Sequence, residues 1–254
     1  MNAHHQRIYI LQSPAEIARA AAEAFVQQTQ QAADEDRDFY VALSGGSTPK
    51  LLYDLLVSDE FRDLVPWSRV RFFFGDERWV PHTDPQSNYK LANDYLFKPL
   101  GIHHQNVYPM PTSGDPGTAA AHYETTLRSA FGISEDEIPQ FDLIFLGMGD
   151  EGHTASLFPH TAVLHNDDHI VAPTYVPKLD ANRVTLTPIA INSASNVLLM
   201  IGGAGKAEAL KQVLEGEDNP DEYPAQFLRN AQGEVTWLAD KAAAADLEGD
   251  YSEA

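Results

Sequence analysis

The chain has 254 residues and is 43% hydrophobic, which is enough apolar material for one large domain or two small ones. Its 37 acidic and 17 basic residues give a formal net charge of -20, which argues against a nucleic-acid or anionic-membrane surface, and an anionic substrate would need a local cluster of Arg, Lys and backbone N–H groups. No apolar run approaches the ~20 residues of a membrane helix, the N-terminal sequence lacks the apolar stretch of a signal peptide, and the absence of Cys excludes disulfide and thiolate chemistry, so we expect a cytoplasmic protein.

The N-terminal part of the chain is predicted to form a strand, a helix and a second strand. Residues 7–11 have the pattern of an edge strand. Ser13 is expected to cap an Ala-rich helix that has Pro14 in its first turn, and the apolar residues that follow recur near helical spacing. After a charged turn at 32–38, residues 39–43 form a short apolar run that is typical of a buried strand.

Residues 44–49, Ser-Gly-Gly-Ser-Thr-Pro, follow this second strand and precede a helical pattern of leucines. A strand, a glycine loop and a capped helix direct N–H groups and the helix dipole towards an anion. The loop lacks the Gly-Lys-Ser/Thr of a Walker loop and the Gly-x-Ser-x-Gly of a hydrolase nucleophile elbow. On the residues alone it is either a phosphate site or an ordinary tight turn with a Ser/Thr cap.

A third predicted strand, residues 70–74, ends in the polar sequence Gly-Asp-Glu-Arg. Two carboxylates, Asp76 and Glu77, beside Arg78 suit the polar edge of an active site, although an ordinary salt-bridged turn has the same composition. A helix that starts at residues 87–89 is expected to follow.

The segment 99–117 is rich in Pro, Gly and His and is expected to be a long irregular connection. His103 and His104 lie in this segment without the further ligands that a metal site requires, so we expect no metal there. The amphipathic pattern at 119–131 predicts another helix.

The stretch 141–159, FDLIFLGMGDEGHTASLFP, contains the strongest candidate for catalysis. Its apolar run ends at a glycine, which is typical of a buried strand, and a parallel strand would deliver the following loop to the carboxyl edge of the sheet, where open α/β folds bind ligands. His153 lies in this loop near Asp150 and Glu151, and a histidine beside a carboxylate is a candidate general base. The alternative is a loop histidine with ordinary hydrogen bonds.

The glycines of this stretch, Gly147, Gly149 and Gly152, have the spacing of the dinucleotide-binding fingerprint. A single match of this kind is weak, because the fingerprint should open a long helix in the first βα turn, whereas Pro159 follows soon after and the stretch lies past the middle of the chain. We therefore expect no nicotinamide or flavin cofactor.

Further strands are predicted in the C-terminal part, at 169–172, 183–187, 196–201 and 234–238. Residues 202–206, Gly-Gly-Ala-Gly-Lys, precede a helix, where Lys206 suits an anion or is simply a solvated surface lysine. The tail beyond residue 246 is expected to be frayed. Alternating strands and helices predict an α/β fold with a doubly wound, mainly parallel, Rossmann-like sheet flanked by helices. We expect one domain over residues 1–254, with a small subregion at 99–135.

Four separate motifs, in the family's order, resemble the 6-phosphogluconolactonase family, within the glucosamine-6-phosphate isomerase/6-phosphogluconolactonase superfamily. The central stretch is similar to the family's Gly-x-Gly-x-Asp-Gly-His-Thr-Ala-Ser-Leu-Phe-Pro loop, and residues 44–49 are similar to its Ser-Gly-Gly-Ser-Thr-Pro loop. Residues 75–81 with 87–89 resemble its Gly-Asp-Glu-Arg-x-Val-Pro and Ser-Asn-Tyr segments, and residues 183–187 resemble its Arg-x-Thr-Leu-Thr segment. The resemblance extends over residues 7–244.

The resemblance implies hydrolysis of 6-phospho-D-glucono-1,5-lactone to 6-phosphogluconate in the oxidative pentose phosphate pathway, without a metal ion or an organic cofactor. His153 is expected to be the general base that activates water, with Glu151 and Asp76 as further catalytic carboxylates. The phosphate-binding residues implied are Gly45, Gly46, Ser47, Thr48, Arg78, Arg183 and Lys206. The sugar-phosphate lactone is the partner implied, neither nucleic acid nor membrane is expected, and the chain is expected to be a monomer or a small homo-oligomer.

The central stretch departs from the family pattern at Glu151, where the family has Asp, and at His160, where a Gly is common. A carboxylate at position 151 could orient the imidazole of His153 and stabilise the imidazolium, Asp150 could take this role, or the carboxylate could only shape the turn. These alternatives are open on the sequence alone.

Two other functions are weighed. Glucosamine-6-phosphate deaminases have a similar central loop, but they continue Ala-Phe-Asn-Glu-Pro after Gly-His-Ile, where this chain has Ala-Ser-Leu-Phe-Pro at 155–159 and lacks the Asn-Glu pair. A non-catalytic sugar-phosphate sensor belongs to a different class, and no DNA-reading helix or basic patch supports it.

Overall fold

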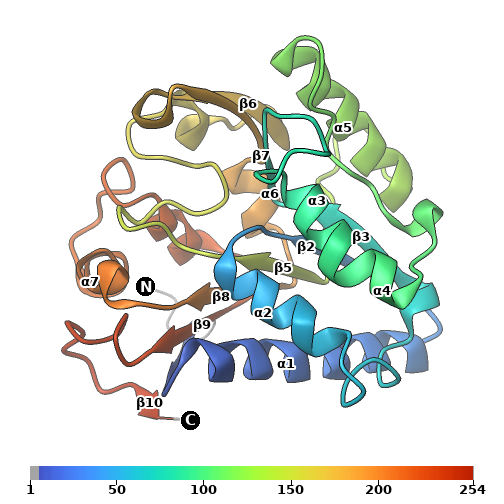
Figure 1. The fold of residues 1–254 in the computed structure, drawn as a ribbon. Coiled ribbons are helices and arrows are strands. Elements are labelled where there is room, and N and C mark those ends of the chain that lie inside the picture. The colour runs from blue at the N-terminus through green and yellow to red at the C-terminus, as the bar shows by residue number, and fades with distance from the viewer. Residues whose placement is uncertain (1–5, 254) are drawn as a thin grey trace.

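The computed structural model describes residues 6–253, and a sheet of seven parallel strands lies at its centre (Figure 1). Neighbouring strands of this sheet pair in parallel throughout. Helices lie on both sides of it, so the predicted doubly wound α/β fold is confirmed. In order across the sheet, the strands are β10 (Ser252–Glu253), β1 (Gln6–Leu11), β9 (Glu234–Asp240), β8 (Asn196–Ile201), β5 (Leu143–Leu146), β2 (Phe39–Leu43) and β3 (Val70–Phe74).

The longest helix, α1 (Pro14–Asp34), runs along one face of the sheet beside α2 (Ser47–Leu56) (Figure 1). It begins where the sequence predicts, because the side chain of Ser13 accepts a hydrogen bond from the backbone N–H of Glu16 at 3.3 Å. The remaining helices are α3 (Asn88–Ala92), α4 (Lys98–Leu100), α5 (Pro116–Phe131), α6 (Pro188–Asn192) and α7 (Ala207–Glu215).

Short helical turns connect several of these elements. One is a π-helical turn, η2 (Asn93–Phe97), which continues α3, so the helix predicted from residues 87–89 is confirmed with this change of winding. The others are 3₁₀ turns: η1 (Trp67–Arg69), η3 (His104–Asn106), η4 (Ala162–His165), η5 (Pro177–Leu179), η6 (Ala204–Lys206) and η7 (Pro224–Asn230).

Aromatic side chains fill the core on both faces of the sheet. Phe25 of α1 packs against Phe39 of β2 and Phe145 of β5, with ring centroids 5.8 Å and 5.9 Å away. The next residue of β2, Tyr40, points to the opposite face, because successive side chains of a strand alternate, and there its ring lies 4.4 Å from Phe131 of α5. The two faces are thus packed independently, which holds the strand ends in place.

A second sheet was not part of the sequence prediction. It is antiparallel and contains β4 (Asp76–Arg78), β7 (Ala181–Leu186) and β6 (Val171–Val176), and it lies beside α5 (Figure 1). The short β4 pairs with a segment more than one hundred positions further along the chain, for example Asp76 with Thr185. Local patterns do not encode such a distant pairing. For this reason residues 76–78 were predicted only as a polar edge after the third strand, without a partner strand.

Two expectations about the chain ends are wrong. β1 is not an edge strand, because the C-terminal strand β10 pairs with it in parallel, with Tyr9 opposite Ser252. The tail beyond residue 246 is correspondingly ordered in part, since the hydroxyl of Tyr251 donates to Glu215 at 2.8 Å.

The proposed single domain, with a small subregion at 99–135, stays a prediction. Within residues 6–253, no helix is both long and apolar enough to cross a bilayer.

The order of the strands creates a switch point between β2 and β5. From β2 the chain passes through α2 to β3 at one edge, whereas from β5 the strands β8 and β9 succeed one another towards the other edge. The loops that leave the carboxyl ends of β2 and β5 therefore diverge, and open α/β folds bind ligands in the crevice that such divergence creates.

Candidate active site

A cavity of about 270 Å³ lies at this switch point. Its walls come from the segments that follow β2, β3, β5 and β8, all at the carboxyl edge of the sheet. The residues that line it are Ser44, Gly45, Gly46, Asp76, Arg78, Gly147, Met148, Gly149, His153, Thr154, Ala155 and Lys206. Of the predicted site residues, Ser47, Thr48, Glu151 and Arg183 are outside this lining.

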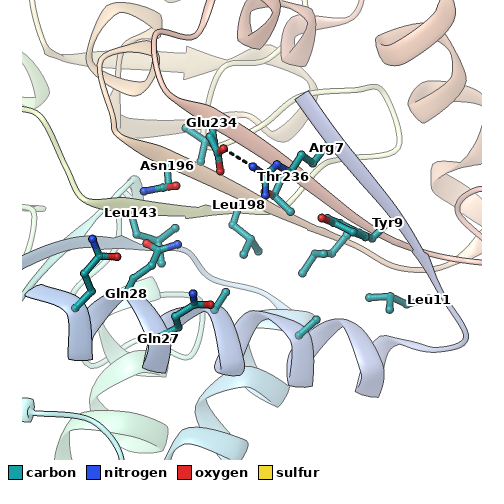
Figure 2. A pocket seen from close by; sticks show the side chains of 15 residues that line it. Arg7, Tyr9, Leu11, Gln27, Gln28, Leu143, Asn196, Leu198, Glu234 and Thr236 are labelled. Atoms are coloured by element: carbon teal, nitrogen blue, oxygen red, sulfur yellow. Dashed lines mark hydrogen bonds and ion pairs between the residues drawn. The ribbon is translucent and has the colours of Figure 1, made fainter. Parts of the chain in front are cut away.

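A larger cavity, about 500 Å³, lies elsewhere, between α1 and the strands β1, β9, β8 and β5 of the sheet (Figure 2). Figure 2 shows Gln27 and Gln28 of α1 on one side and strand residues such as Tyr9 on the other. Among residues 6–253, its wall includes neither histidine nor lysine, and the arginine there, Arg7, is paired with Glu234 at 2.7 Å. None of the glycine loops reaches this cavity, so we place the candidate active site at the switch point.

The loop after β5 presents His153 to the switch-point cavity. The loop turns at Gly152, whose φ of +76° is a conformation that favours glycine, and it is closed by a hydrogen bond from the N–H of Gly149 to the carbonyl of His153 at 2.8 Å. The imidazole stacks on Phe158, with ring centroids 3.9 Å apart. It also approaches the backbone of Gly149 so closely that a Cβ there would lie 2.0 Å from Nδ1.

The spacing of Gly147, Gly149 and Gly152 does not open a helix here. After Gly152 the chain forms a bridge between Thr154 and Leu157 and then turns. The dinucleotide fingerprint requires a helix N-terminus at this point, so the geometry differs from that of a Rossmann cofactor site.

The environment of His153 favours a neutral imidazole. Burial is the largest influence and lowers its pKa, the nearby carboxylates Glu151 and Asp76 raise it, and Lys206 lowers it, with a net result below the usual value. Its Nδ1 lies 3.3 Å from Oε2 of Glu151, but this contact lacks the geometry of a hydrogen bond. Nδ1 has no other hydrogen-bond partner among the described residues. A carboxylate on the Nδ1 side favours a proton on Nδ1, which leaves Nε2 free to accept one.

The two neighbouring carboxylates of the loop have different partners. Glu151 is near His153 and is also bound by Lys178, whose Nζ lies 2.9 Å from Oε1. Asp150 is instead paired with Lys206, with Oδ1 2.5 Å from Nζ. The geometry therefore places Glu151, the residue that departs from the family pattern, at the imidazole.

Asp76 belongs to a buried polar network on the opposite wall of the cavity. Its Oδ2 accepts a hydrogen bond from the hydroxyl of Ser156 at 2.6 Å, and its Oδ1 accepts one from the amide of Asn88 at 3.0 Å. Glu77 points elsewhere and accepts hydrogen bonds from the backbone N–H groups of Asn88 and Tyr89 at the start of α3. Of the two adjacent carboxylates, only Asp76 lines the cavity.

The loop after β2 contributes backbone and a hydroxyl. Ser44 is buried, and its Oγ is without a hydrogen-bond partner in the part of the chain that the structure describes. Gly46 is the N-cap of α2 and provides no side-chain cap, so the first N–H groups of that helix, including those of Ser47 and Thr48, are left for an anion or solvent.

Two arginines stand side by side across the second sheet. Arg78 of β4 pairs in register with Arg183 of β7. Their guanidinium groups donate to backbone carbonyls, of Gln86 at 2.7 Å and of Asn182 at 3.0 Å, and within residues 6–253 neither forms an ion pair with a carboxylate. Burial and repulsion by Arg78 lower the pKa of Arg183. The pair is thus a concentration of positive charge in a strongly acidic chain.

Several residues of this site were not predicted from the sequence. Ser44 and Ser156 stand inside the motifs quoted above, so the motifs themselves were the available signal. Asn88 was likewise read as the start of a helix and not as a partner of Asp76. No local signal pointed to Lys178, because its contact with Glu151 depends on the second sheet.

The chain matches the family model described as glucosamine-6-phosphate isomerases/6-phosphogluconolactonase over residues 12–237. It belongs to this family. The membership implied by the sequence motifs is therefore confirmed.

Individual relatives cover most of the chain. The 6-phosphogluconolactonase of Synechocystis sp. is 41% identical over 208 residues, which is 82% of this chain and 84% of that protein. The 6-phosphogluconolactonase of Bos taurus is 38% identical over 242 residues, 93% of this chain and 92% of that protein. The solved structure of 6-phosphogluconolactonase from Trypanosoma cruzi is similar with a TM-score of 0.86 and 32% identity, over 97% of this chain and 100% of that one.

Proposed function

We propose that this chain hydrolyses 6-phospho-D-glucono-1,5-lactone to 6-phosphogluconate, with His153 as the general base. The observation that carries the proposal is the imidazole of His153 in the wall of the switch-point cavity, 3.3 Å from Glu151, in a cavity that Arg78 and Lys206 also line. Relatives named 6-phosphogluconolactonase support the same reaction class. A cytoplasmic location and a monomeric or small oligomeric state stay predictions.

A lactone is an activated ester, so water needs modest assistance to attack it. Nε2 of His153 takes a proton from water while the water oxygen forms a bond to C1 of the lactone. The negative charge that develops on the former carbonyl oxygen is stabilised by N–H groups of the glycine loops. When the bond between C1 and the ring oxygen breaks, protonated His153 returns the proton to that oxygen, which becomes a hydroxyl of the product.

The two carboxylates have separate parts in this proposal. Glu151 keeps the proton of His153 on Nδ1 and stabilises the imidazolium that forms during the reaction. Asp76 has its oxygens held by Ser156 and Asn88, so it is a fixed acceptor for a sugar hydroxyl or for the attacking water. Neither role requires a covalent intermediate or a metal ion.

The substrate phosphate is assigned to a positively charged wall that consists of Arg78, Arg183, Lys206 and the N–H groups at the start of α2. Arg78 and Arg183 have no carboxylate partner among the described residues, and the free N–H groups at the start of α2 add a partial positive charge. Lys206 completes this wall from the loop after β8. In a chain with a net charge of -20, such a local cluster is what a dianionic substrate requires.

The proposal is tested by the rate of lactone disappearance with the purified chain, measured against an enzyme-free blank because the lactone also hydrolyses spontaneously. Turnover well above the blank is expected. Release of ammonia from glucosamine 6-phosphate would instead indicate a deaminase, and saturable binding of 6-phosphogluconate without turnover would indicate a sensor.

Lys206 gives a direct test of the phosphate assignment. Loss of its ammonium in Lys206→Ala removes a charge-assisted hydrogen bond, so KM is expected to rise roughly tenfold or more while kcat changes less. Lys211→Ala is the matched control, because that lysine lies on α7 and pairs with Glu248. An equal loss on the unphosphorylated lactone would show that Lys206 does not act on the phosphate.

Substitutions of the two loop carboxylates distinguish their roles. Glu151→Gln is expected to lower kcat with little change in KM, because the loss falls on the transition state, whereas Glu151→Asp restores the family residue and should stay active. Asp150→Asn is expected to act mainly on KM, since Asp150 is the partner of Lys206. A fully active Glu151→Gln together with an Asp150→Asn of low kcat would transfer the role to Asp150.

A further inference from the structure

The second sheet brings one more charged side chain to the catalytic loop. The hairpin between β6 and β7 turns at η5 (Pro177–Leu179) and at Asp180, whose φ is +47°. Lys178 lies at this turn and reaches across to Glu151, with Nζ 2.9 Å from Oε1. Its side chain is 68% exposed, whereas that of Glu151 is 25% exposed, so the carboxylate is the sheltered partner of the pair.

The two oxygens of Glu151 are divided between two partners. Oε1 is bound by Lys178, and Oε2 faces Nδ1 of His153 at 3.3 Å. A carboxylate is planar, so an ammonium that holds one oxygen also restricts the direction of the other. We propose that Lys178 is a positioning residue for the reaction: it holds Glu151 so that its second oxygen faces the imidazole of His153.

This inference rests on the proposed function and deepens it, because Lys178 acts on His153 only through Glu151. Burial is the largest single influence on the pKa of Glu151 and raises it. The hydrogen bond from Lys178, a backbone N–H and the charges of His153 and Lys178 lower it, and together they outweigh burial, so the net pKa lies below the usual value. Without Lys178, burial is opposed less and the pKa of Glu151 rises.

The charged groups around Lys178, Glu151 and His153 come from four segments. His153 is faced by Glu151 from its own loop, by Asp76 from β4 and by Lys206 from the loop after β8. Lys178, from the β6–β7 hairpin, is influenced by Glu151 and more weakly by Asp150. The charge of Glu151 is the strongest influence that raises the pKa of His153. Removal of Lys178 frees this carboxylate to turn away from Nδ1, so the pKa of His153 falls. The acidic limb of the pH–rate profile follows the pKa of the base and moves to lower pH.

The test is Lys178→Met, which keeps the length and apolar stem of the side chain. We expect roughly a two- to fivefold lower kcat, the size typical of an exposed ion pair, with little change in KM for the phosphorylated lactone. The acidic limb of kcat/KM is expected to move to lower pH. Lys178→Arg retains the charge and is expected to recover most of the activity and the wild-type profile.

Lys98→Met is the matched control. Lys98 also forms an ion pair with a carboxylate, Asp94 at 2.7 Å, and its side chain is 66% exposed, but it lies on α4 outside the cavity. Wild-type kinetics are expected for this variant. In the background of Glu151→Gln, Lys178→Met is expected to have no further effect on kcat, because the carboxylate through which it acts is gone.

A second readout needs no substrate. The imidazole titration of His153, followed by NMR and assigned from its absence in His153→Ala, is expected to shift to lower pH in Lys178→Met. Absence of this shift would overturn the proposal, as would additive effects of the Lys178 and Glu151 substitutions or a loss confined to KM. If the wild-type chain does not turn over the lactone, the proposed function fails, but the titration still decides whether Lys178 acts on His153.

Discussion

The variant His153→Ala is expected to lose roughly 10²–10⁴-fold in turnover of the lactone, the range that a positioned general base contributes. The physical reason is that His153 is the imidazole on the wall of the switch-point cavity, and burial lowers its pKa, which favours the unprotonated base. Binding of 6-phosphogluconate should persist, because the positively charged wall is untouched. Initial rates corrected for spontaneous hydrolysis, together with product binding by calorimetry, measure the two effects.

His165→Ala is the matched control for this prediction. His165 also pairs with a carboxylate, Asp221 at 2.8 Å, but it lies in η4 and does not line the cavity. We expect it to retain wild-type turnover. Near-wild-type turnover of His153→Ala would remove His153 from the mechanism, and loss of product binding with a lowered melting temperature would show that the substitution acted through the fold.

Gly149→Ala is expected to lower kcat by roughly 10²-fold, the effect of a reacting group displaced by about 1 Å. The backbone of Gly149 does not have a positive φ, so alanine meets no backbone strain there. Its Cβ, however, would lie 2.0 Å from Nδ1 and 2.1 Å from Cε1 of His153, and the imidazole is stacked on Phe158. The ring must therefore turn away from its place in the cavity.

The control for this variant is Gly75→Ala, directly after strand β3, where the nearest atoms to an added Cβ are 3.7 Å away. It is expected to keep both its activity and its melting temperature. Kinetics and thermal unfolding of the two variants separate a displaced base from a damaged fold. A fully active Gly149→Ala would mean that the position of the imidazole is not critical for the reaction.

The parallel sheet and much of the candidate site could be predicted from the sequence for one physical reason. Short apolar runs such as 39–43 and 143–146 predict buried strands, and the carboxyl ends of parallel strands meet at one edge. The residues that follow those runs were therefore expected to lie close together in space. Gly45, Gly46 and His153 do line one cavity. Helix starts were also predictable where a cap is local, as at Ser13.

Pairings between distant segments were decided only by the tertiary structure. The antiparallel sheet sets Arg78 beside Arg183 and carries Lys178 to Glu151, although no local pattern encodes either contact. The choice between Asp150 and Glu151 was also open in the sequence, because neighbouring residues of a loop can point in different directions. In the structure, Lys206 is the partner of Asp150 and Glu151 lies at the imidazole, which favours Glu151 for this role. Local chemistry thus determined which loops are candidates for function, whereas long-range strand register determined which side chains meet.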